Sequence, residues 1–363
     1  MSLTDQILDL AIQIQQIPAP TFAEGARAAF VRTRFMEAER LTDVEIDADG
    51  NVFARLPGAG DAPPLVVSAH LDTVFPHDTD LSVRRTADKI SAPGIGDNSL
   101  GVAGLFGLLW QLRSQRIPLP GDLWLVANVC EEGLGDLKGM RAVVDRFGDT
   151  PRAYIILEGM MYGEVVHRAL GVQRYRITVR TEGGHSWADY GRPSAVHELA
   201  GLVARLTALK LPAQPRTTLN VGMISGGTSV NTIAARASLE LDLRSEEAGS
   251  LQNLVREVEA LVAAANRPGV DVRAAIIGQR PAGYLSKDHP LVQKAVQSLK
   301  MQGEPARLLI GSTDANIPLS RGLPGVCIGL TRGGGAHTLD EFIDPTHLEK
   351  GMAQLVNLVE RCA

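Results

Sequence analysis

Leu65-Val-Val-Ser-Ala69 is a short run of apolar and small residues, and His70-Leu-Asp72 follows it directly. A run without polar alternation is typical of a β-strand that is buried on both faces of a sheet. Similar runs recur further along the chain, separated by helical patterns, and this alternation predicts a parallel sheet with right-handed crossover connections. The predicted elements are hairpin strands 44–46 and 52–56, buried strands 65–69, 123–130 and 153–157, and helices 22–39, 98–115 and 138–147.

The sequence pattern changes near Val172. Tyr175-Arg-Ile-Thr-Val-Arg-Thr181 alternates apolar and polar side chains, as a strand with one solvated face does. The following elements have the order β-α-β-β-α-β, which is that of a ferredoxin-like module. We therefore predict an α/β domain with a mostly parallel sheet, formed by residues 1–171 and 284–363, that is interrupted by an inserted α+β domain of residues 172–283.

Composition excludes several classes of partner. The 363 residues contain 36 Lys and Arg and 41 Asp and Glu, a net charge of −5, without a basic block. We therefore expect neither nucleic acid nor a membrane surface as a partner. The three cysteines lack CxxC spacing, so neither a disulfide framework nor a thiolate zinc site is encoded. Without a signal or membrane-spanning pattern, we expect a cytoplasmic protein.

Ionisable residues follow the buried strands at the points where these strands end. His70 and Asp72 follow the first strand, Glu131 and Glu132 the second, and Glu158 the third. Ligands of open α/β sheets bind at the carboxyl ends of the strands, so these side chains should share one crevice.

Two loop residues, Asp97 and His337, complete the candidate set. Several carboxylates in one cleft repel one another unless cations neutralise them. Imidazole and carboxylate ligands suit Zn(II), with Co(II) or Mn(II) as alternatives, and one carboxylate can bridge two ions. The sequence therefore predicts a site for two Zn(II) ions per chain.

Six motifs resemble, in order, those of the M20 metallopeptidases, the family of carboxypeptidase G2, acetylornithine deacetylase, succinyl-diaminopimelate desuccinylase and peptidase T. They extend over nearly the whole chain, including the inserted domain. The motifs are Ser68-Ala-His-Leu-Asp72, Gly94-Ile-Gly-Asp-Asn98, Cys130-Glu-Glu-Gly133, Leu157-Glu-Gly159, Gly183-Gly-His-Ser186 and Ala336-His-Thr338.

The resemblance implies a role for each residue of the candidate set. Asp97 would bridge both metal ions through a site with a cis Asp97-Asn98 peptide bond, and Asp72 would orient the His70 ring. Glu131 would be the general base that deprotonates a metal-bound water. The metal ligands implied by the resemblance are His337 and Glu132 on one ion, His70 and Glu158 on the other, and Asp97 on both.

The resemblance also assigns roles to the inserted domain. It would serve as a lid and dimerisation domain of a zinc exopeptidase-type enzyme, and His185 would reach the partner subunit's active site to stabilise the oxyanion. Asn231 and Arg244 would hold the substrate carboxylate, for which an Arg fork is well suited. A homodimer is therefore expected.

The expected activity is hydrolysis of an amide or peptide bond next to a free carboxylate, by a carboxypeptidase or an N-acyl-amino-acid deacylase. The substrate would be a small peptide or an N-acyl amino acid. Glu158 favours these branches, because aminopeptidases resembling peptidase T usually carry Asp at that ligand. Two alternatives remain: a peptidase T-like aminopeptidase, and a catalytically silent, metal-dependent binding module.

Overall fold

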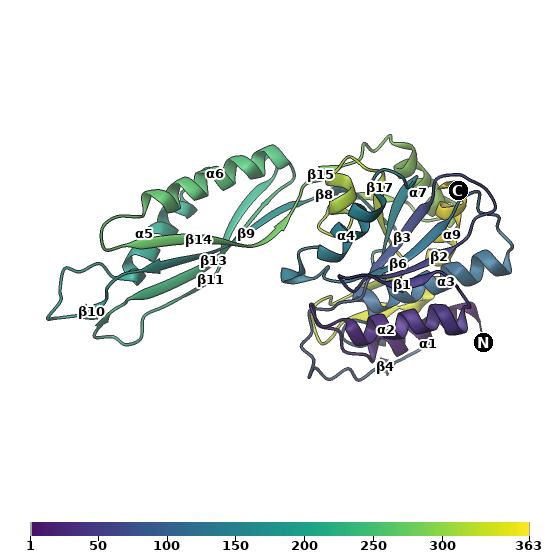
Figure 1. The fold of residues 1–363 in the computed structure, drawn as a ribbon, viewed down its shortest axis with the longest axis horizontal. Coiled ribbons are helices and arrows are strands. Elements are labelled where there is room, and N and C mark those ends of the chain that lie inside the picture. The colour runs from purple at the N-terminus through teal and green to yellow at the C-terminus, as the bar shows by residue number, and fades with distance from the viewer. Residues whose placement is uncertain (1, 363) are drawn as a thin grey trace. The chain divides into compact units, whose positions relative to one another are not determined.

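The computed structural model describes residues 2–362, and the chain divides into two compact units. Unit 1 comprises the segments that end at Ala169 and begin at Tyr284, and unit 2 comprises Leu170–Gly283 (Figure 1). The first boundary lies two residues before the one that the sequence pattern suggested, because the first strand of unit 2 already begins at Gly171.

Unit 1 is built on a nine-stranded sheet whose four central strands, β6, β3, β7 and β17, are parallel. All six residues of β3 and of β7 are buried, as expected for central strands covered on both faces. In sheet order the strands are β1 (Val44–Ile46), β2 (Val52–Leu56), β6 (Leu123–Asn128), β3 (Leu65–His70), β7 (Ala153–Glu158), β17 (Gly325–Gly329), β8 (Glu164–Ala169) and β15 (Gly283–Tyr284), with β16 (Arg307–Gly311) paired to β8.

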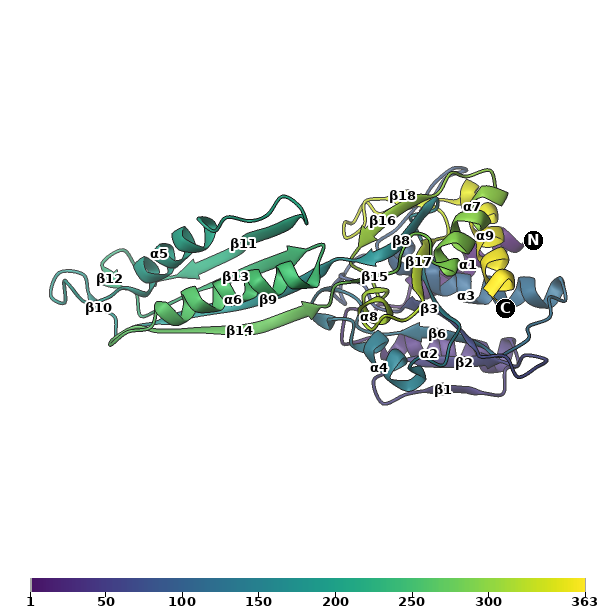
Figure 2. The same ribbon diagram turned by 90° about the horizontal axis from the view of Figure 1, so that it is seen from above.

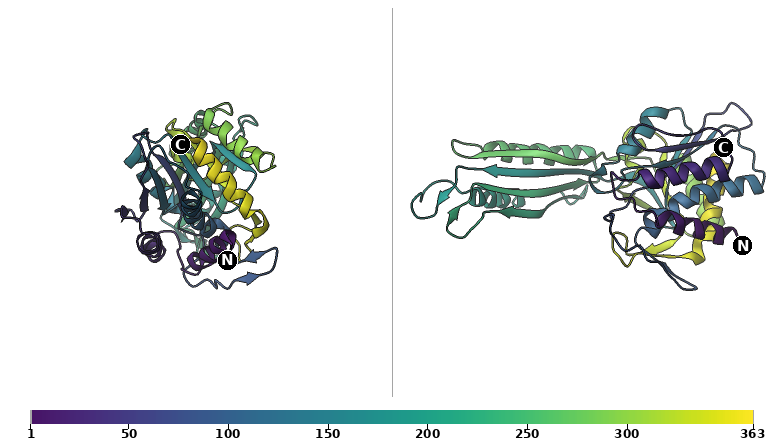
Figure 3. Two further views of the ribbon diagram at one scale, coloured as in Figure 1. Left: turned by 90° about the vertical axis from the view of Figure 1, so that its right-hand side faces the viewer. Right: turned by 60° about the horizontal axis from the view of Figure 1, so that its bottom comes forward.

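Helices pack against this sheet and enclose the larger hydrophobic core. The mostly buried α3 contacts β3 and β7 as well as α1 and α9, and α4 contacts β6. Figure 3 shows α9, in yellow, lying across the strands. The helices are α1 (Leu3–Gln15), α2 (Gly25–Thr33), α3 (Leu100–Ser114), α4 (Lys138–Phe147), α7 (Pro290–Met301), α8 (Asn316–Ser320) and α9 (Leu348–Cys362).

Two features of unit 1 differ from the sequence prediction. The helix predicted for residues 22–39 begins only at Gly25, because Phe22 adopts a left-handed turn conformation with φ of 75°, and it ends in a π-helical turn, Arg34–Ala38. The sequence also gave no sign of a small antiparallel sheet that joins distant segments. Its strands are β18 (Arg332–Gly334), β19 (Phe342–Asp344), β5 (Ile90–Ser91) and β4 (Arg84–Arg85).

Unit 2 is a four-stranded antiparallel sheet in the order β11-β13-β9-β14, with α5 and α6 on one face (Figure 2). Alternate residues of β9 and β13 are buried under these helices in a second hydrophobic core. The chain order is the predicted β-α-β-β-α-β. The elements are β9 (Gly171–Arg180), α5 (Ala195–Thr207), β11 (Thr217–Gly226), β13 (Arg236–Ser245), α6 (Ala248–Ala264) and β14 (Asp271–Arg280), with a short pair, β10 (Gly184–His185) and β12 (Thr232–Ile233).

Candidate metal centre

The ends of three parallel strands bring buried ionisable side chains together. His70 is the last residue of β3 and Glu158 is the last residue of β7, while Glu131 and Glu132 follow β6. All four side chains are buried. Because β3 lies between β6 and β7 with parallel register, the ends of these strands meet at one edge, as the sequence pattern predicted.

Two groups of possible metal ligands share Asp97. One group is His70, Asp97 and Glu158, and the other is Asp97, Glu132 and His337. Asp97 Oδ1 lies 3.1 Å from His70 Nε2, and Asp97 Oδ2 lies 3.1 Å from His337 Nε2. His337 Nε2 is also 3.1 Å from Glu132 Oε1, and His70 Nε2 is 3.7 Å from Glu158 Oε2. The two oxygens of Asp97 thus face different groups, which is the arrangement of a bridging carboxylate.

The turn that carries Asp97 is held against the end of β7. The Asp97-Asn98 peptide bond is cis, as the resemblance implied. Asn98 Nδ2 donates to the Leu157 carbonyl and Asn98 Oδ1 accepts from the Gly159 N–H, both at 2.8 Å. A Cβ on Gly159 would lie 2.3 Å from the Gly96 carbonyl oxygen, so the close approach requires glycine there. Asn98 therefore places Asp97 beside Glu158.

Asp72 has a different geometry from the one expected. The shorter contact of His70 Nδ1 is with the Asp72 backbone carbonyl, at 3.0 Å, whereas the Asp72 carboxylate is 3.5 Å away. That carboxylate instead accepts from the backbone N–H groups of Glu131 and Glu132, both at 2.9 Å, and from the Thr21 hydroxyl. Asp72 thus orients His70 mainly through its main chain, and its side chain holds the turn that carries the two glutamates.

Glu341 is a positioning residue that the sequence analysis missed. Its buried carboxylate accepts from the backbone N–H groups of Gly94, Gly96 and Asp97 at 2.7–3.1 Å. Burial raises the pKa of Glu341 to about 7, although these hydrogen bonds oppose the shift. The residue reaches the Asp97 turn because β19 pairs with β5, a contact between segments about 250 positions apart that no local pattern signals.

We expect Glu341→Ala to destabilise the protein by about 3 kcal/mol or more, because it leaves three buried N–H groups unpaired at roughly 1–3 kcal/mol each. Glu341→Gln, which keeps one carbonyl acceptor, should cost less. Urea unfolding of both variants measures the difference. The control is Asp340→Asn, since the side chain of Asp340 is 91% exposed. Equal stability of Glu341→Ala and Asp340→Asn would contradict the positioning role.

The charges of the centre fit divalent cations. Burial raises the pKa of Glu158 to about 7, and the neighbouring Asp97 adds to this rise, while His70 opposes it. Hydrogen bonds to Asp97 and Glu132 raise the pKa of His337 to about 10. Without a metal ion, protons on Glu158 and His337 offset the repulsion between the clustered carboxylates. Bound divalent cations would offset the same repulsion without these protons. The donor set is two imidazoles and carboxylates, which suits zinc, cobalt or manganese.

Cys130 does not belong to this donor set. Its Sγ lies 3.5 Å from Glu24 Oε1, and burial together with the charge of Glu24 raises the pKa of the thiol to about 12. A protonated thiol is a poor metal ligand. Glu131, by contrast, lies close to the centre, with a carboxylate oxygen within 4.8 Å of possible ligand atoms of His70 and Glu132.

The three unit 2 candidates do not form one cluster within the unit. His185 pairs with Thr232, and the carbonyl of Asn231 accepts from the Ser186 N–H, so His185 and Asn231 lie near each other. Arg244 lies at the opposite end of β13, eight residues beyond Arg236, which at roughly 3.3 Å per residue is about 26 Å. There its Nε donates to Asp242 at 2.7 Å.

The tautomer of His185 follows from its hydrogen bonds. Nδ1 accepts from the backbone N–H groups of Trp187 and Ala188, at 3.2 and 3.3 Å. In the neutral ring the proton is therefore on Nε2, so the exposed His185 presents an N–H donor to its surroundings.

A sequence model of Peptidase family M20/M25/M40 matches residues 66–361. A Peptidase M20 domain-containing protein of Schizosaccharomyces pombe is 30% identical over 205 residues, which cover 54% of this chain and 48% of that protein. A probable carboxypeptidase of Aspergillus clavatus is 30% identical over 271 residues, 66% of this chain and 57% of that protein. The match thus spans about half the length of these two relatives. YqjE of Bacillus subtilis is 21% identical over 374 residues, which cover 99% of this chain and 98% of that protein.

Solved structures share the fold over almost the whole chain. The aminopeptidase PepT from Bacillus cereus has a TM-score of 0.81 and a tripeptidase from Staphylococcus aureus one of 0.84, each 21% identical, with 99% of this chain and 98% of the other covered. YxeP of Bacillus subtilis, described as a dinuclear metal-binding peptidase from the M20 family, has a TM-score of 0.69 at 17% identity, with 99% and 98% covered. Among residues 2–362, no helix combines the length and the apolar character needed to cross a bilayer.

Proposed function

Because this chain belongs to the M20/M25/M40 peptidase family, we propose that it hydrolyses an amide or peptide bond next to a free carboxylate, as a carboxypeptidase or an N-acyl-amino-acid deacylase with two Zn(II) ions. The observation that carries the proposal is the position of Asp97, whose two oxygens each face a different ligand group. A pair of ions sharing one carboxylate is a common arrangement in hydrolases.

The proposed ligands are those that the sequence indicated: His70, Glu158 and Asp97 for one ion, and His337, Glu132 and Asp97 for the other. When bound, such ions polarise a carbonyl group and lower the pKa of water. Asp72 and Glu341 keep the ligands in place through the backbone hydrogen bonds described above.

Glu131 is the proposed general base. A carboxylate oxygen of Glu131 lies within 4.8 Å of possible ligand atoms of His70 and Glu132, and Glu131 would take a proton from the attacking water and deliver it to the leaving amine. The backbone N–H of Glu131 donates to Asp72, which limits the movement of this base.

The unit 2 residues support a homodimer. A dipeptide spans roughly 7 Å when extended, so it cannot contact both Arg244 and His185 of one chain, which lie at opposite ends of the sheet. We propose that Arg244 and Asn231 hold the substrate carboxylate and that His185 Nε2–H stabilises the oxyanion. Because Arg244 lies far from His185 and Asn231 within one chain, one subunit of a dimer would supply Arg244 and the other would supply His185 and Asn231. Sedimentation equilibrium should then show a dimer at assay concentrations. A fully active monomer would contradict an active site built from two chains.

A second candidate is an aminopeptidase of the peptidase T kind, favoured by the fold similarity to PepT and to the tripeptidase. The carboxypeptidase or deacylase preference rests on Glu158 and on the names of the curated relatives. Peptides with a free α-amine and the same peptides N-acylated distinguish the two. Cleavage of the N-acylated set supports our proposal, whereas cleavage only of the free-amine set would replace it with the aminopeptidase.

A third candidate is a catalytically silent binding module, which the retention of every ligand position and of Glu131 argues against. Elemental analysis of gently purified protein, followed by amide hydrolysis after chelation and after zinc return, tests it. We expect close to two metal equivalents per chain, with activity lost and then restored. Metal binding without any turnover across the peptide panel would favour the binding module.

A further inference from the structure

The open face of the unit 2 sheet carries a cluster of arginines. The residues of β9 and β13 that alternate with the buried core positions point away from α5 and α6. On this face, Arg176 donates to Glu240 at 2.8 Å and Arg273 donates to Asp271 at 3.2 Å. These two guanidinium groups are therefore already neutralised.

Arg180 and Arg236 differ from the other arginines of the face. They are direct register partners on β9 and β13, and both are exposed. Among residues 2–362, neither guanidinium has an acidic side chain within ion-pair distance. Like charges placed directly opposite each other across two strands destabilise a sheet. A bound anion would remove this repulsion.

A hollow of 560 Å³ lies over this face beside Arg236. Its polar lining consists of two arginines and hydroxyl side chains, and no carboxylate of the described chain lines it. An adjoining hollow of 200 Å³ shares Arg176 and Thr178 with it and is lined further by Arg180, Arg273 and Asp271. The polar side chains of the larger hollow include Arg176, Arg236, Thr178, Ser225, Thr232 and Ser238.

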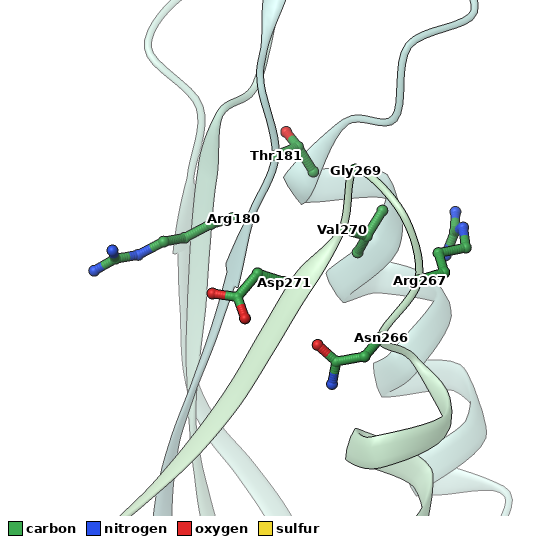
Figure 4. Close-up of a pocket in the computed structure, with 7 residues that line it drawn as sticks. All are labelled: Arg180, Thr181, Asn266, Arg267, Gly269, Val270 and Asp271. Atoms are coloured by element: carbon green, nitrogen blue, oxygen red, sulfur yellow. The ribbon is translucent and has the colours of Figure 1, made fainter.

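A third hollow, of 590 Å³ at the end of β14, is a weaker candidate. Arg267, which lines it, already forms two 2.7 Å hydrogen bonds with Glu198. In Figure 4 the Arg180 side chain extends away from Asn266 and Arg267, and the Asp271 carboxylate lies between them. An anion there would meet a carboxylate and a cation that is already paired.

We propose that the hollow beside Arg236 binds a small dianionic ligand, either a phosphate monoester or a dicarboxylate. Arg236, which lines the hollow, holds its charge, because guanidinium groups pair with such oxyanions through parallel hydrogen bonds. Arg180, its register partner in the adjoining hollow, adds positive charge nearby. The hydroxyl groups donate the remaining hydrogen bonds. The volume is within the range of roughly 300–1,000 Å³ that is typical of small-molecule sites. The site is independent of the proposed hydrolysis, although Thr232, which lines it, is the register partner of His185.

Isothermal titration of the full chain with inorganic phosphate and, separately, with succinate tests the proposal. The protein is first treated with a chelator, so that ions in the metal centre do not bind the probe. We expect one saturable site per chain, with Arg236→Gln weakening binding by about tenfold or more, as loss of a hydrogen bond to a charged group does. Arg205→Gln is the control, because Arg205 is exposed on α5, which covers the other face. The probe that binds more tightly identifies the ligand class.

Thermal unfolding gives a second readout that also checks folding. Without ligand, Arg236→Gln should unfold at the same or a higher temperature than the unmodified chain, because it removes one member of a like-charged pair. Phosphate or succinate should raise the unfolding temperature of the unmodified chain and of Arg205→Gln but not that of Arg236→Gln. The proposal is overturned if neither probe binds at millimolar concentration, if Arg236→Gln binds as the control does, or if only an RNA oligonucleotide binds.

Discussion

We expect Glu131→Gln to lower kcat by about 10²- to 10⁴-fold, the usual contribution of a general acid or base. The substitution keeps the shape of the side chain and removes its ability to accept a proton. The backbone N–H that binds Asp72 is unaffected, so the turn and its neighbour Glu132 should remain in place. Steady-state kinetics on the best substrate of the peptide panel, with metal content measured in parallel, gives the result.

The matched control for this substitution is Glu349→Gln, because Glu349 is exposed on α9, in unit 1. It should leave kcat and metal content unchanged. If Glu131→Gln keeps full turnover, another group is the base. If the Glu131→Gln variant loses metal together with activity, Glu131 is a metal ligand and its assignment as the general base is wrong.

We expect Asp97→Ala to remove metal from both proposed positions, because both ligand groups include this carboxylate. His337→Ala affects only the group that contains Glu132, so it should retain about one equivalent where Asp97→Ala retains close to none. Activity should be lost in both variants. The difference in metal content between the two variants tests bridging. If the two sites were independent, Asp97→Ala would remove one ion at most, as His337→Ala does.

The free energy of unfolding should respond to zinc in the same way as the metal content does. At free zinc about 100-fold above the dissociation constant, each ion stabilises the folded chain by about 2.7 kcal/mol. The unmodified chain should therefore gain unfolding free energy when zinc is added, and Asp97→Ala should gain almost none. Exposed Asp340→Asn serves as the control and should respond as the unmodified chain does. A full zinc response of Asp97→Ala would mean that the ions bind elsewhere.

Much of the fold could be predicted because it follows from local patterns. The hairpin strands Val44–Ile46 and Val52–Leu56 and the helix Lys138–Phe147 have the predicted bounds. Buried parallel strands read as continuous apolar runs, and the residue after such a run lies at the ligand-binding edge of the sheet. His70 and Glu158 were found in this way.

Other parts of the site depend on contacts between distant segments. Glu341 acts on the Asp97 turn through the pairing of β19 with β5, and neither strand has more than three residues. The resemblance assigned Asp72 to the His70 ring, yet its carboxylate accepts hydrogen bonds from backbone N–H groups about sixty positions away. Sequence neighbours constrain main-chain geometry well, whereas the partner of a buried carboxylate is decided by which N–H groups the fold leaves unpaired nearby.

The amino-acid sequence alone determined the family, the two-part α/β and α+β organisation and the identity of the possible ligands, because periodicity and short motifs are local properties. The tertiary structure decided that the two oxygens of Asp97 face different ligand groups, that Glu341 and Asn98 hold the Asp97 turn, and that Arg180 lies opposite Arg236. These are questions of distance between residues far apart along the chain. They depend on strand register and on packing, and register emerges only when the whole sheet has formed.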